Sequence, residues 1–227
     1  MTQVNTTSAG THTGTLTELI GSLTRAEIKF LQVALSTDKT REQLTHGVIR
    51  YSEKCNSFIV ASTDTHRLHV VRVGKNGNLE GCKTDIMPTV DINSIARQMA
   101  AFKSDRLDIY ARISTTGEYI ALEFIAQNVP AIQNAIITNI GAFPNIESVM
   151  LESLDSQHVG LKGSFNGAYI SDACTHLMEK KENAVRVTFW QMESMRPAYI
   201  LDSQCSINSH HVELGRKFSI VMPMQII

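Results

Sequence analysis

The amino-acid sequence predicts an α+β protein built from repeated units, each made of one amphipathic helix followed by antiparallel strands. Three segments of the 227-residue chain carry helical periodicity, and each is followed by segments in which apolar and polar residues alternate. This order recurs at roughly 70 residues, which indicates about three copies of one unit. A sheet covered by helices still has two open edge strands, so we expect edge pairing with another subunit.

The first unit begins with a helix expected from Thr24 to Ser36. Thr24 and Glu27 fit the T-x-x-E pattern of a capping box, in which each side chain accepts a hydrogen bond from the other residue's backbone N–H. Ile28, Leu31 and Leu35 recur at three- and four-residue steps, which places one buried face on this helix. The strands expected to follow it cover residues 48–51, 58–61 and 68–73.

The second and third units repeat this order. A helix is expected from Asp91 to Ser104, with Asp91 as N-cap candidate and with a buried face that runs from Ile92 to Phe102. The third helix is expected to begin near Asn166 and to bury one face in the same way. The strands expected after these two helices cover residues 107–113, 119–125, 185–189, 198–201 and 218–222.

Composition indicates an ordinary globular protein. The chain is 43% hydrophobic and 19% charged, and no window approaches the roughly 18 consecutive apolar residues of a membrane span. The start of the chain is polar and lacks the basic and apolar regions of a signal peptide, so we expect a cytoplasmic protein. The net charge of −1 argues against binding nucleic acid by bulk attraction. This charge does not exclude DNA altogether, because a protein that closes into a ring can hold DNA topologically with only a modestly positive inner wall.

Candidate catalytic and metal-binding groups are sparse. The four cysteines lie far apart, without a CxxC pair or a histidine at metal-ligand spacing, so the sequence predicts free thiols, no metal site and no cofactor. Asp64 and His66 could suggest acid–base chemistry, but no nucleophile or second carboxylate accompanies them. We therefore expect a protein that is not an enzyme.

Four short motifs occur in order along the chain. They are Ser62-Thr63-Asp64-Thr65-His66-Arg67-Leu68, Phe143-Pro144-Asn145, Phe165-Asn166-Gly167-Ala168-Tyr169 and Val221-Met222-Pro223-Met224. Together they resemble the β subunit of bacterial DNA polymerase III, the sliding clamp. That family has T-D-G-H-R-L, F-P-D, F-N-x-x-Y and V-M-P-M segments in this order, and the resemblance covers about residues 24 to 227.

The resemblance implies the DNA-clamp fold, a ring of similar domains that each contain two helix-plus-strands units. The helices of such a ring face the DNA hole, and its sheets form the outer wall. We expect residues 1–15 to be a disordered tail, 16–150 a complete clamp domain of two units, and 151–227 a C-terminal clamp unit, either half a domain or a shortened second domain. Family rings contain twelve units, so a homo-oligomer would close as a tetramer of three-unit chains or as a trimer of four-unit chains.

The resemblance also implies a cleft for short client peptides. Its expected residues are Thr63, His66, Arg67, Leu68, Leu151, Tyr169, Ile220, Met222, Pro223, Met224 and Gln225. Methionine suits such a cleft because its flexible apolar side chain accepts varied peptides. Thr65, Leu151 and Gln225 replace the family's glycine, proline and arginine. If the glycine position requires a positive φ, a β-branched residue is unfavourable there, and we expect a rearranged loop.

Basic residues recur on the three expected helices, which the resemblance turns toward DNA: Arg25, Lys29, Arg97, Lys103, Lys180 and Lys181. The implied function is a sliding clamp, or processivity factor, that encircles duplex DNA and tethers DNA polymerase or other clamp-binding-motif proteins. Because the sequence has no nucleotide-binding loop, a separate ATP-dependent clamp loader is expected. The alternative is a clamp mimic that does not encircle DNA and regulates a resident clamp or its clients. The basic helices favour the clamp, and the short chain favours the mimic.

Overall fold

The structure is a computed structural model of the whole chain. It describes residues 15–74, 89–114, 119–126, 136–137, 142–151, 154–155, 158–177, 187–202, 205–207, 211–213 and 215–224. The described α-helices are α1 (Arg25–Val33), α2 (Ile92–Ala101) and α3 (Gly167–Leu177). Short 3-10 helices cover Glu42–Leu44 and Ile146–Ser148.

The strands of the described residues form three sheets, and the largest of these is eight-stranded, in the order β10-β11-β14-β4-β3-β2-β5-β8. Its strands are β2 (Gly47–Ser52), β3 (Ser57–Thr63), β4 (Arg67–Gly74), β5 (Thr89–Val90), β8 (Ile136–Ile137), β10 (Thr188–Trp190), β11 (Ala198–Leu201) and β14 (Lys217–Val221). The other two sheets have the orders β1-β6-β7 and β12-β13-β9. They contain β1 (Thr15–Thr24), β6 (Arg106–Ser114), β7 (Tyr119–Ala126), β9 (Leu154–Asp155), β12 (Ser206–Ile207) and β13 (His211–Glu213).

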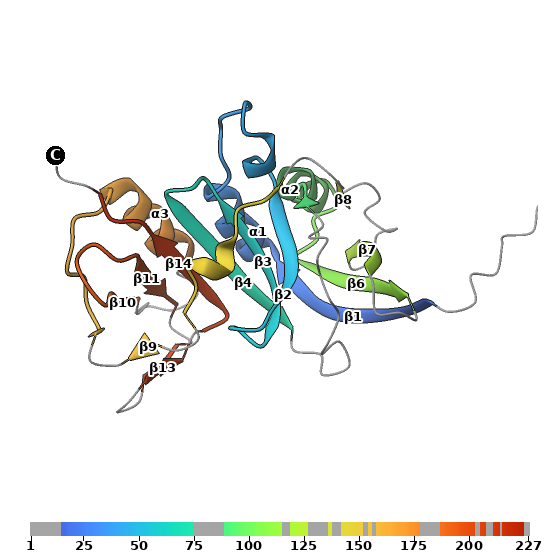
Figure 1. Cartoon of the computed structure of the whole chain (residues 1–227). Helices are drawn as coiled ribbons and strands as arrows, with labels where there is room; N and C mark the ends of the chain where they lie inside the picture. Colours follow the sequence, from blue (N-terminus) through green and yellow to red (C-terminus); the bar gives the residue numbers. More distant parts are fainter. Residues whose placement is uncertain are drawn as a thin grey trace, which may run out of the picture.

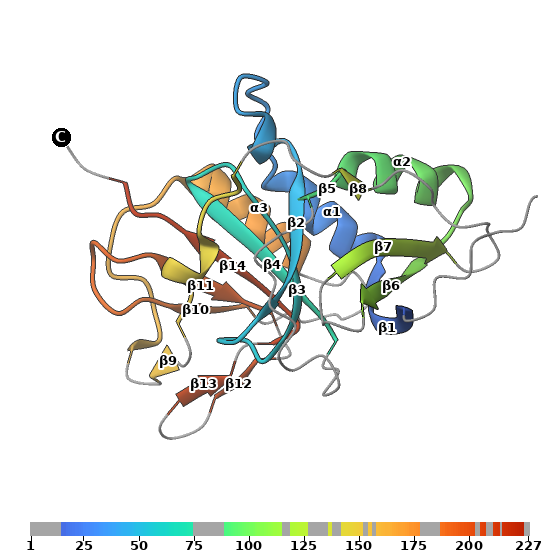
Figure 2. The same ribbon diagram turned by 45° about the vertical axis from the view of Figure 1, so that its right-hand side comes forward.

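The three helix-plus-strands units are joined through their sheets. Strands of the first and second units pair with each other. Strand β1, which precedes α1, pairs with β6, which follows α2, and β5, which precedes α2, pairs with β2, which follows α1; both pairs are antiparallel. The third unit joins the first through the antiparallel pair β14 and β4, in register from Lys217 opposite Val71 to Val221 opposite Arg67. Figures 1 and 2 show the result, with the third unit at one end of the molecule and β6, β7 and α2 at the other. The predicted α+β fold of repeated units is confirmed.

Alternation along β3 explains why this strand is buried on both faces. Phe58 and Val60 pack with the helices and β1, whereas Ile59 and Ala61 face the opposite side of the sheet. The chain from Phe143 to Leu151 covers that opposite face and contains the predicted Phe-Pro-Asn motif. The buried Tyr199 hydroxyl fixes this segment, since it donates to the Val149 carbonyl (2.8 Å) and accepts from the Leu151 N–H (2.7 Å).

The capping box predicted at the start of α1 is present. The Glu27 carboxylate accepts from the Thr24 N–H at 2.7 Å, and the Thr24 hydroxyl accepts from the Glu27 N–H at 3.2 Å. Arg216, beside β14, forms an ion pair with the same buried carboxylate and donates to the Ser22 carbonyl at 2.7 Å. This cluster therefore ties the third unit to the first.

Some predicted boundaries were wrong. Helix α1 ends at Val33 rather than Ser36, because the Ser36 hydroxyl accepts from the Asp38 N–H and so stabilises a turn instead of another helical turn. Phe102 follows the end of α2 as its C-cap and is 52% exposed, so it does not belong to the buried face. Strand β1 was missed altogether.

Other predictions fall partly outside the described residues. The residues outside the described part of the chain include 1–14 of the expected tail, 185 and 186 of an expected strand, and Cys82. Cys55, Cys174 and Cys205 are free, as predicted. Within the described residues, no helix is long and apolar enough to cross a membrane. Nor does that part of the chain contain a cluster of side chains able to hold a metal ion.

Candidate functional site

Two adjoining pockets lie where the β3–β4 turn, α3 and the end of the chain meet. The first, here called the apolar pocket, has a volume of about 350 Å³. It is lined by His66, Asn166, Tyr169, Met222, Pro223 and Met224. Three segments that are distant in sequence therefore form one hollow, whose methionines and proline come from the chain after β14.

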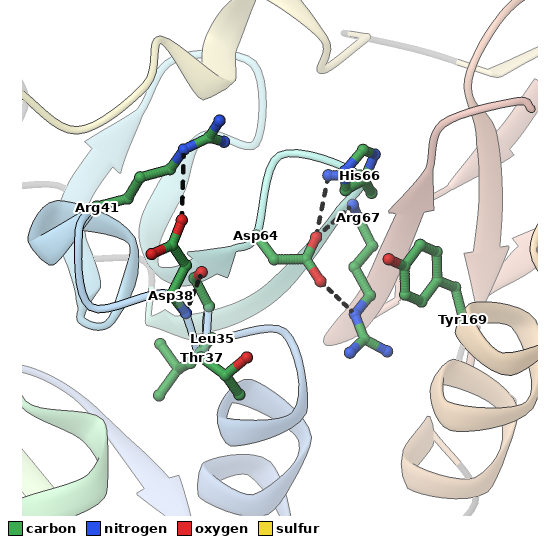
Figure 3. Close-up of a pocket in the computed structure, with 9 residues that line it drawn as sticks. Leu35, Thr37, Asp38, Arg41, Asp64, His66, Arg67 and Tyr169 are labelled. Atoms are coloured by element: carbon green, nitrogen blue, oxygen red, sulfur yellow. Dashed lines mark hydrogen bonds and ion pairs between the residues drawn. The ribbon is translucent and has the colours of Figure 1, made fainter.

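The second, here called the polar pocket (Figure 3), has a volume of about 440 Å³ and shares His66 and Tyr169 with the apolar pocket. Its lining is Leu35, Ser36, Thr37, Asp38, Arg41, Asp64, His66, Arg67 and Tyr169. The His66 and Tyr169 rings are nearly parallel, with centroids 6.2 Å apart. These two rings separate an apolar compartment from a charged one.

The β3–β4 turn is held by its own polar groups. The Asp64 carboxylate accepts from the backbone N–H groups of His66 and Arg67, both at 3.0 Å. The Thr63 hydroxyl accepts from the Thr65 N–H (3.0 Å) and donates to the Arg67 carbonyl (2.6 Å). Thr65 has a φ of +81°, so the position does adopt the left-handed region that suits glycine. The expected loop rearrangement is therefore not seen, because the turn keeps this conformation with threonine in place.

Arg67 joins the turn to two helices. Its guanidinium pairs with Asp64 at 3.1 Å and with Asp172 of α3 at 2.7 Å, and it donates to the Val33 carbonyl at the end of α1 at 2.6 Å. The same group lies 4.5 Å from the centroid of the Tyr169 ring, a cation–π contact. Arg67 thereby fixes the aromatic wall between the two pockets.

Backbone hydrogen bonds hold the chain after β14 across the site. The Met222 N–H donates to the His66 carbonyl at 2.9 Å, and the Met224 N–H donates to the Ser164 carbonyl at 2.8 Å. Met222 and Pro223 are half-buried, whereas the Met224 side chain is 52% exposed at the mouth of the apolar pocket. An extended apolar ligand could therefore contact Met224 without displacing the core.

The structure brings six of the predicted cleft residues together: His66, Arg67, Tyr169, Met222, Pro223 and Met224. Thr63, Leu68 and Ile220 are buried beneath them and support the turn and the sheet rather than line a pocket. Leu151 lies with the segment that covers the outer face of the sheet and lines neither pocket. Gln225 lies outside the described residues.

Sequence reasoning missed two parts of the site. Asn166 lines the apolar pocket, and its side chain accepts from the Ala168 N–H at the start of α3 (2.9 Å). It stands in the Phe-Asn-Gly-Ala-Tyr motif, which could have identified it. The segment from Leu35 to Arg41 supplies a wall of the polar pocket but carries no motif, so no sequence signal indicated it.

Two groups at and beneath the site have shifted pKa values. Hydrogen bonds from the Thr40 hydroxyl and N–H lower the pKa of Asp38, which therefore stays ionised beside Arg41. Burial lowers the pKa of His69 to about 3 and keeps the ring neutral. The His69 ring stacks on Phe30 with centroids 4.2 Å apart, and its Nδ1 lies 2.6 Å from the Phe30 carbonyl oxygen, so Nδ1 carries the proton and donates.

A second candidate surface lies along α1 and α2. Arg25, Lys29 and Arg97 are exposed and line a groove of about 260 Å³ between the two helices. The acidic residue of these helices, Glu27, is buried, so their exposed charges are all positive. Lys103 is exposed just beyond α2, whereas Lys180 and Lys181 lie outside the described residues.

The units, their shared sheets and the positions of the motifs define the ring-clamp class of folds. The chain has the fold of the bacterial sliding clamp, the β subunit of DNA polymerase III. The sliding clamp of Bartonella birtlesii bound to griselimycin is similar, with 14% identity and a TM-score of 0.56 over 98% of this chain and 69% of that one. The β chain of DNA polymerase III from Streptococcus pneumoniae is also similar, with 14% identity and a TM-score of 0.57 over 99% of this chain and 67% of that one.

A third similar structure is the Caulobacter crescentus β sliding clamp with polyethylene glycol bound to a putative β-motif tethering region. It shows 14% identity and a TM-score of 0.54, over 97% of this chain and 68% of that one. No protein-family model matches the sequence, and no curated protein matches it. The fold that the four motifs predicted is thus confirmed by structure, at identities too low to transfer a function.

Proposed function

We propose that this protein is a sliding clamp, a subunit that assembles into a ring around duplex DNA and tethers a DNA polymerase or repair protein by a short peptide motif. The observation that carries the proposal is the apolar pocket. His66, Tyr169 and Met224 converge there from three separate segments, on a chain with the clamp fold. In this proposal the protein makes and breaks no bonds, and a separate ATP-dependent loader opens the ring.

The chemistry of the apolar pocket suits an extended peptide with a glutamine and one or two large apolar residues. Methionine side chains adapt to different apolar partners, and the polar groups of His66 and Asn166 at the rim can orient the peptide. Backbone bonds at Met222 and Met224 hold the pocket's floor in place before a ligand arrives. Little ordering is then required on binding, which favours affinity.

Met224→Ala tests this pocket. Loss of this apolar contact at the mouth of the pocket should weaken binding of a fluorescein-labelled peptide with one glutamine, one leucine and one phenylalanine by about 1 to 3 kcal/mol in fluorescence anisotropy. Met195→Ala is the matched control, because Met195 is also an exposed methionine (62%) but lies on the loop after β10. Equal affinity of both variants and wild type would place the binding surface elsewhere, and no binding by wild type would refute this cleft.

The basic groove between α1 and α2 supports the DNA part of the proposal. A duplex held by a ring needs only weak, non-specific attraction to phosphates, and three exposed cations without an exposed carboxylate on these helices provide it. Replacing Arg25, Lys29 and Arg97 by glutamate should abolish salt-sensitive binding to labelled duplex DNA. The control reverses Lys39, Lys162 and Arg196, which are exposed on other segments. Equal losses in both triple variants would remove the groove from the proposal.

Exposed apolar side chains at both ends of the molecule support assembly. Val159, Leu161, Met192 and Met195 lie at the β10 end, and Leu19 and Phe102 lie at the β1 and α2 end. These ends are opposite in Figures 1 and 2, so copies can associate head to tail. A head-to-tail contact closes into a ring when its rotation permits, as a tetramer or a trimer in this proposal.

A clamp mimic is the second candidate, and one observation favours it. Helix α3 carries Asp172 and no lysine or arginine between Gly167 and Leu177, unlike α1 and α2. A third helix without a cation makes the inner wall of the proposed ring less positive. The mimic is favoured if the chain proves monomeric and binds the peptide but not duplex DNA.

A further inference from the structure

We infer that residues 158–163 form a strap that closes the outer edge of β10 and prevents a second copy of the chain from adding a strand there. Strand β10 ends the eight-stranded sheet, beyond β11 and β14, as Figures 1 and 2 show. An edge strand of this kind offers backbone N–H and carbonyl groups to any strand that meets it. The inference does not depend on the proposed function, because it concerns this edge in a clamp and in a clamp mimic alike.

The first two units show how the corresponding edge is covered elsewhere in the molecule. Strand β6 follows α2, and β1, the strand before α1, pairs along its length, from Thr24 opposite Arg106 to Thr15 opposite Ser114. Strand β10 is the next described strand after α3 and so has the corresponding place in the third unit. Among the described residues, β11 is the only strand of the sheet that pairs with β10. The outer edge of β10 is therefore the edge that β1 covers on β6.

The strap covers this edge with its own backbone. The Gly160 N–H donates to the Phe189 carbonyl at 2.6 Å. The Gln191 N–H donates to the His158 carbonyl at 3.0 Å, so that the strap forms an isolated antiparallel bridge opposite Trp190. The two bonds engage backbone groups on both sides of Trp190, which β11 pairs from the other side. A strand of a second copy would have to break both bonds before it could pair with β10.

The Gln191 side chain fastens the strap to the loop after β10. It is fully buried, and its amide oxygen accepts from the Lys162 N–H at 2.6 Å. Its amide nitrogen donates to the Ser194 carbonyl at 3.1 Å and to the Arg196 carbonyl at 2.9 Å. The Lys162 ammonium adds a bond to the Met192 carbonyl at 3.0 Å. Because a buried amide is costly to leave unbonded, these contacts favour a strap that stays in place.

Two glycines allow the strap to follow this path. Gly160 has a φ of +125°, a conformation that other residues rarely adopt, although a Cβ atom there would meet no atom within 4 Å. At Gly163 a Cβ atom would lie 2.3 Å from the Ser194 carbonyl oxygen, so a larger residue could not approach the loop as closely. Gly160 is therefore the position at which the strap can be opened without removing a side-chain contact.

Gly160→Pro tests the strap in the full-length protein, because proline lacks the N–H that bonds to Phe189 and cannot adopt a φ of +125°. Hydrogen exchange measured by mass spectrometry should become about tenfold faster in the peptide that contains Gln191, with no change in peptides from β3. Light scattering over a concentration series should report a larger mass than that of the wild type, because the open edge pairs with other copies.

Gly167→Pro is the matched control. Gly167 is also a glycine with open space around its Cβ position, but it is the first residue of α3, where proline is tolerated. The control should leave the exchange at Gln191 and the mass unchanged. Gly160→Ala is a milder variant that keeps the N–H and strains only φ. It should show both changes to a smaller degree, which keeps the test decisive if proline disturbs the whole third unit.

Three results would overturn the inference. If the Gln191 N–H exchanges equally fast in the wild type and in Gly160→Pro, the strap does not cover the edge. If exchange becomes faster while the mass stays equal, the covered edge does not limit association. A smaller mass would show that the strap is itself a contact between copies. A wild type with the mass of one chain would contradict the proposed ring without touching this comparison, so the two failures are distinguishable.

Discussion

Replacing Arg67 tests whether the site depends on a single buried cation. The side chain joins three elements, because it bonds to Asp64 in the β3–β4 turn, to Asp172 on α3 and to the Val33 carbonyl at the end of α1. Arg67→Ala removes all three bonds and the cation–π contact with Tyr169 at once. We expect a large loss of folding stability together with a looser cleft.

The size of the loss follows from the exposure of each partner. The Asp172 side chain is 42% exposed, so its ion pair contributes less than about 1 kcal/mol. The bond to the Val33 carbonyl and the pair with Asp64 are shielded, and charge-assisted bonds of this kind contribute about 1.5 to 3 kcal/mol each. Asp64 keeps its two backbone donors in the variant, which limits the penalty. We therefore expect Arg67→Ala to lower the free energy of unfolding by about 3 kcal/mol.

Urea denaturation at one fixed protein concentration measures this change. With a typical slope of about 2 kcal/mol per molar urea, the midpoint should fall by about 1.5 M, with the slope unchanged. The urea midpoint of Arg67→Lys should lie between those of the wild type and Arg67→Ala, because an ammonium cannot make three planar bonds at once. Arg106→Ala serves as the control, since the Arg106 pair with Asp108 is exposed and should change stability by less than about 0.5 kcal/mol. An Arg67→Ala variant as stable as the control would refute the reasoning.

Three further predictions concern single residues. Thr65→Gly should raise the free energy of unfolding by about 1 kcal/mol, because the backbone strain that glycine relieves at φ +81° outweighs the stability lost to glycine's greater freedom in the unfolded chain. A lower melting temperature of the variant would contradict this. Tyr199→Phe should lower the free energy of unfolding by about 2 kcal/mol, because the Val149 carbonyl and the Leu151 N–H lose their partner, as chemical denaturation would detect. The depressed pKa of His69, about 3 in the fold against an ordinary 6.5, means that only the unfolded chain takes up this proton below pH 6.5. The stabilisation that comes from keeping His69 neutral in the fold is therefore complete above pH 6.5 and is lost as the pH falls toward 3. Between pH 7 and pH 5 the wild type should lose about 2 kcal/mol more than His69→Asn, and equal pH slopes would contradict the assignment.

The helices could be predicted from the sequence because their signals are local. The Thr24 and Glu27 capping box lies within one turn of α1, and Asp91 caps α2 by accepting from the Ser94 N–H (2.8 Å). Apolar periodicity identified all three described helices for the same reason. Phe102 misled the prediction because it continues that periodicity by spacing alone, although the helix has already ended at Ala101.

Strand β1 and the exchange of strands could not be predicted in this way. Thr15 to Thr24 alternates only weakly around Gly21, and its partner β6 begins at Arg106. Gly21 is required there by a close approach, since a Cβ atom would lie 2.0 Å from the Val73 carbonyl oxygen. Contacts of this kind are set by the folded chain and leave little trace in the local sequence.

The apolar pocket was predicted and the polar pocket was not, for a related reason. His66, Tyr169 and Met222 to Met224 stand in motifs that a resemblance can identify. Arg41 stands in no such motif, and the structure alone shows that it lines a pocket together with His66 and Tyr169.

The mass of the protein in solution tests the central proposal most directly. Light scattering coupled to gel filtration, over a series of concentrations, measures it without knowledge of any client or loader. A ring of twelve helix-plus-strands units predicts the mass of four chains, or of three if each chain contributes a fourth unit. A mass of one chain at every concentration would contradict the ring and favour the clamp mimic.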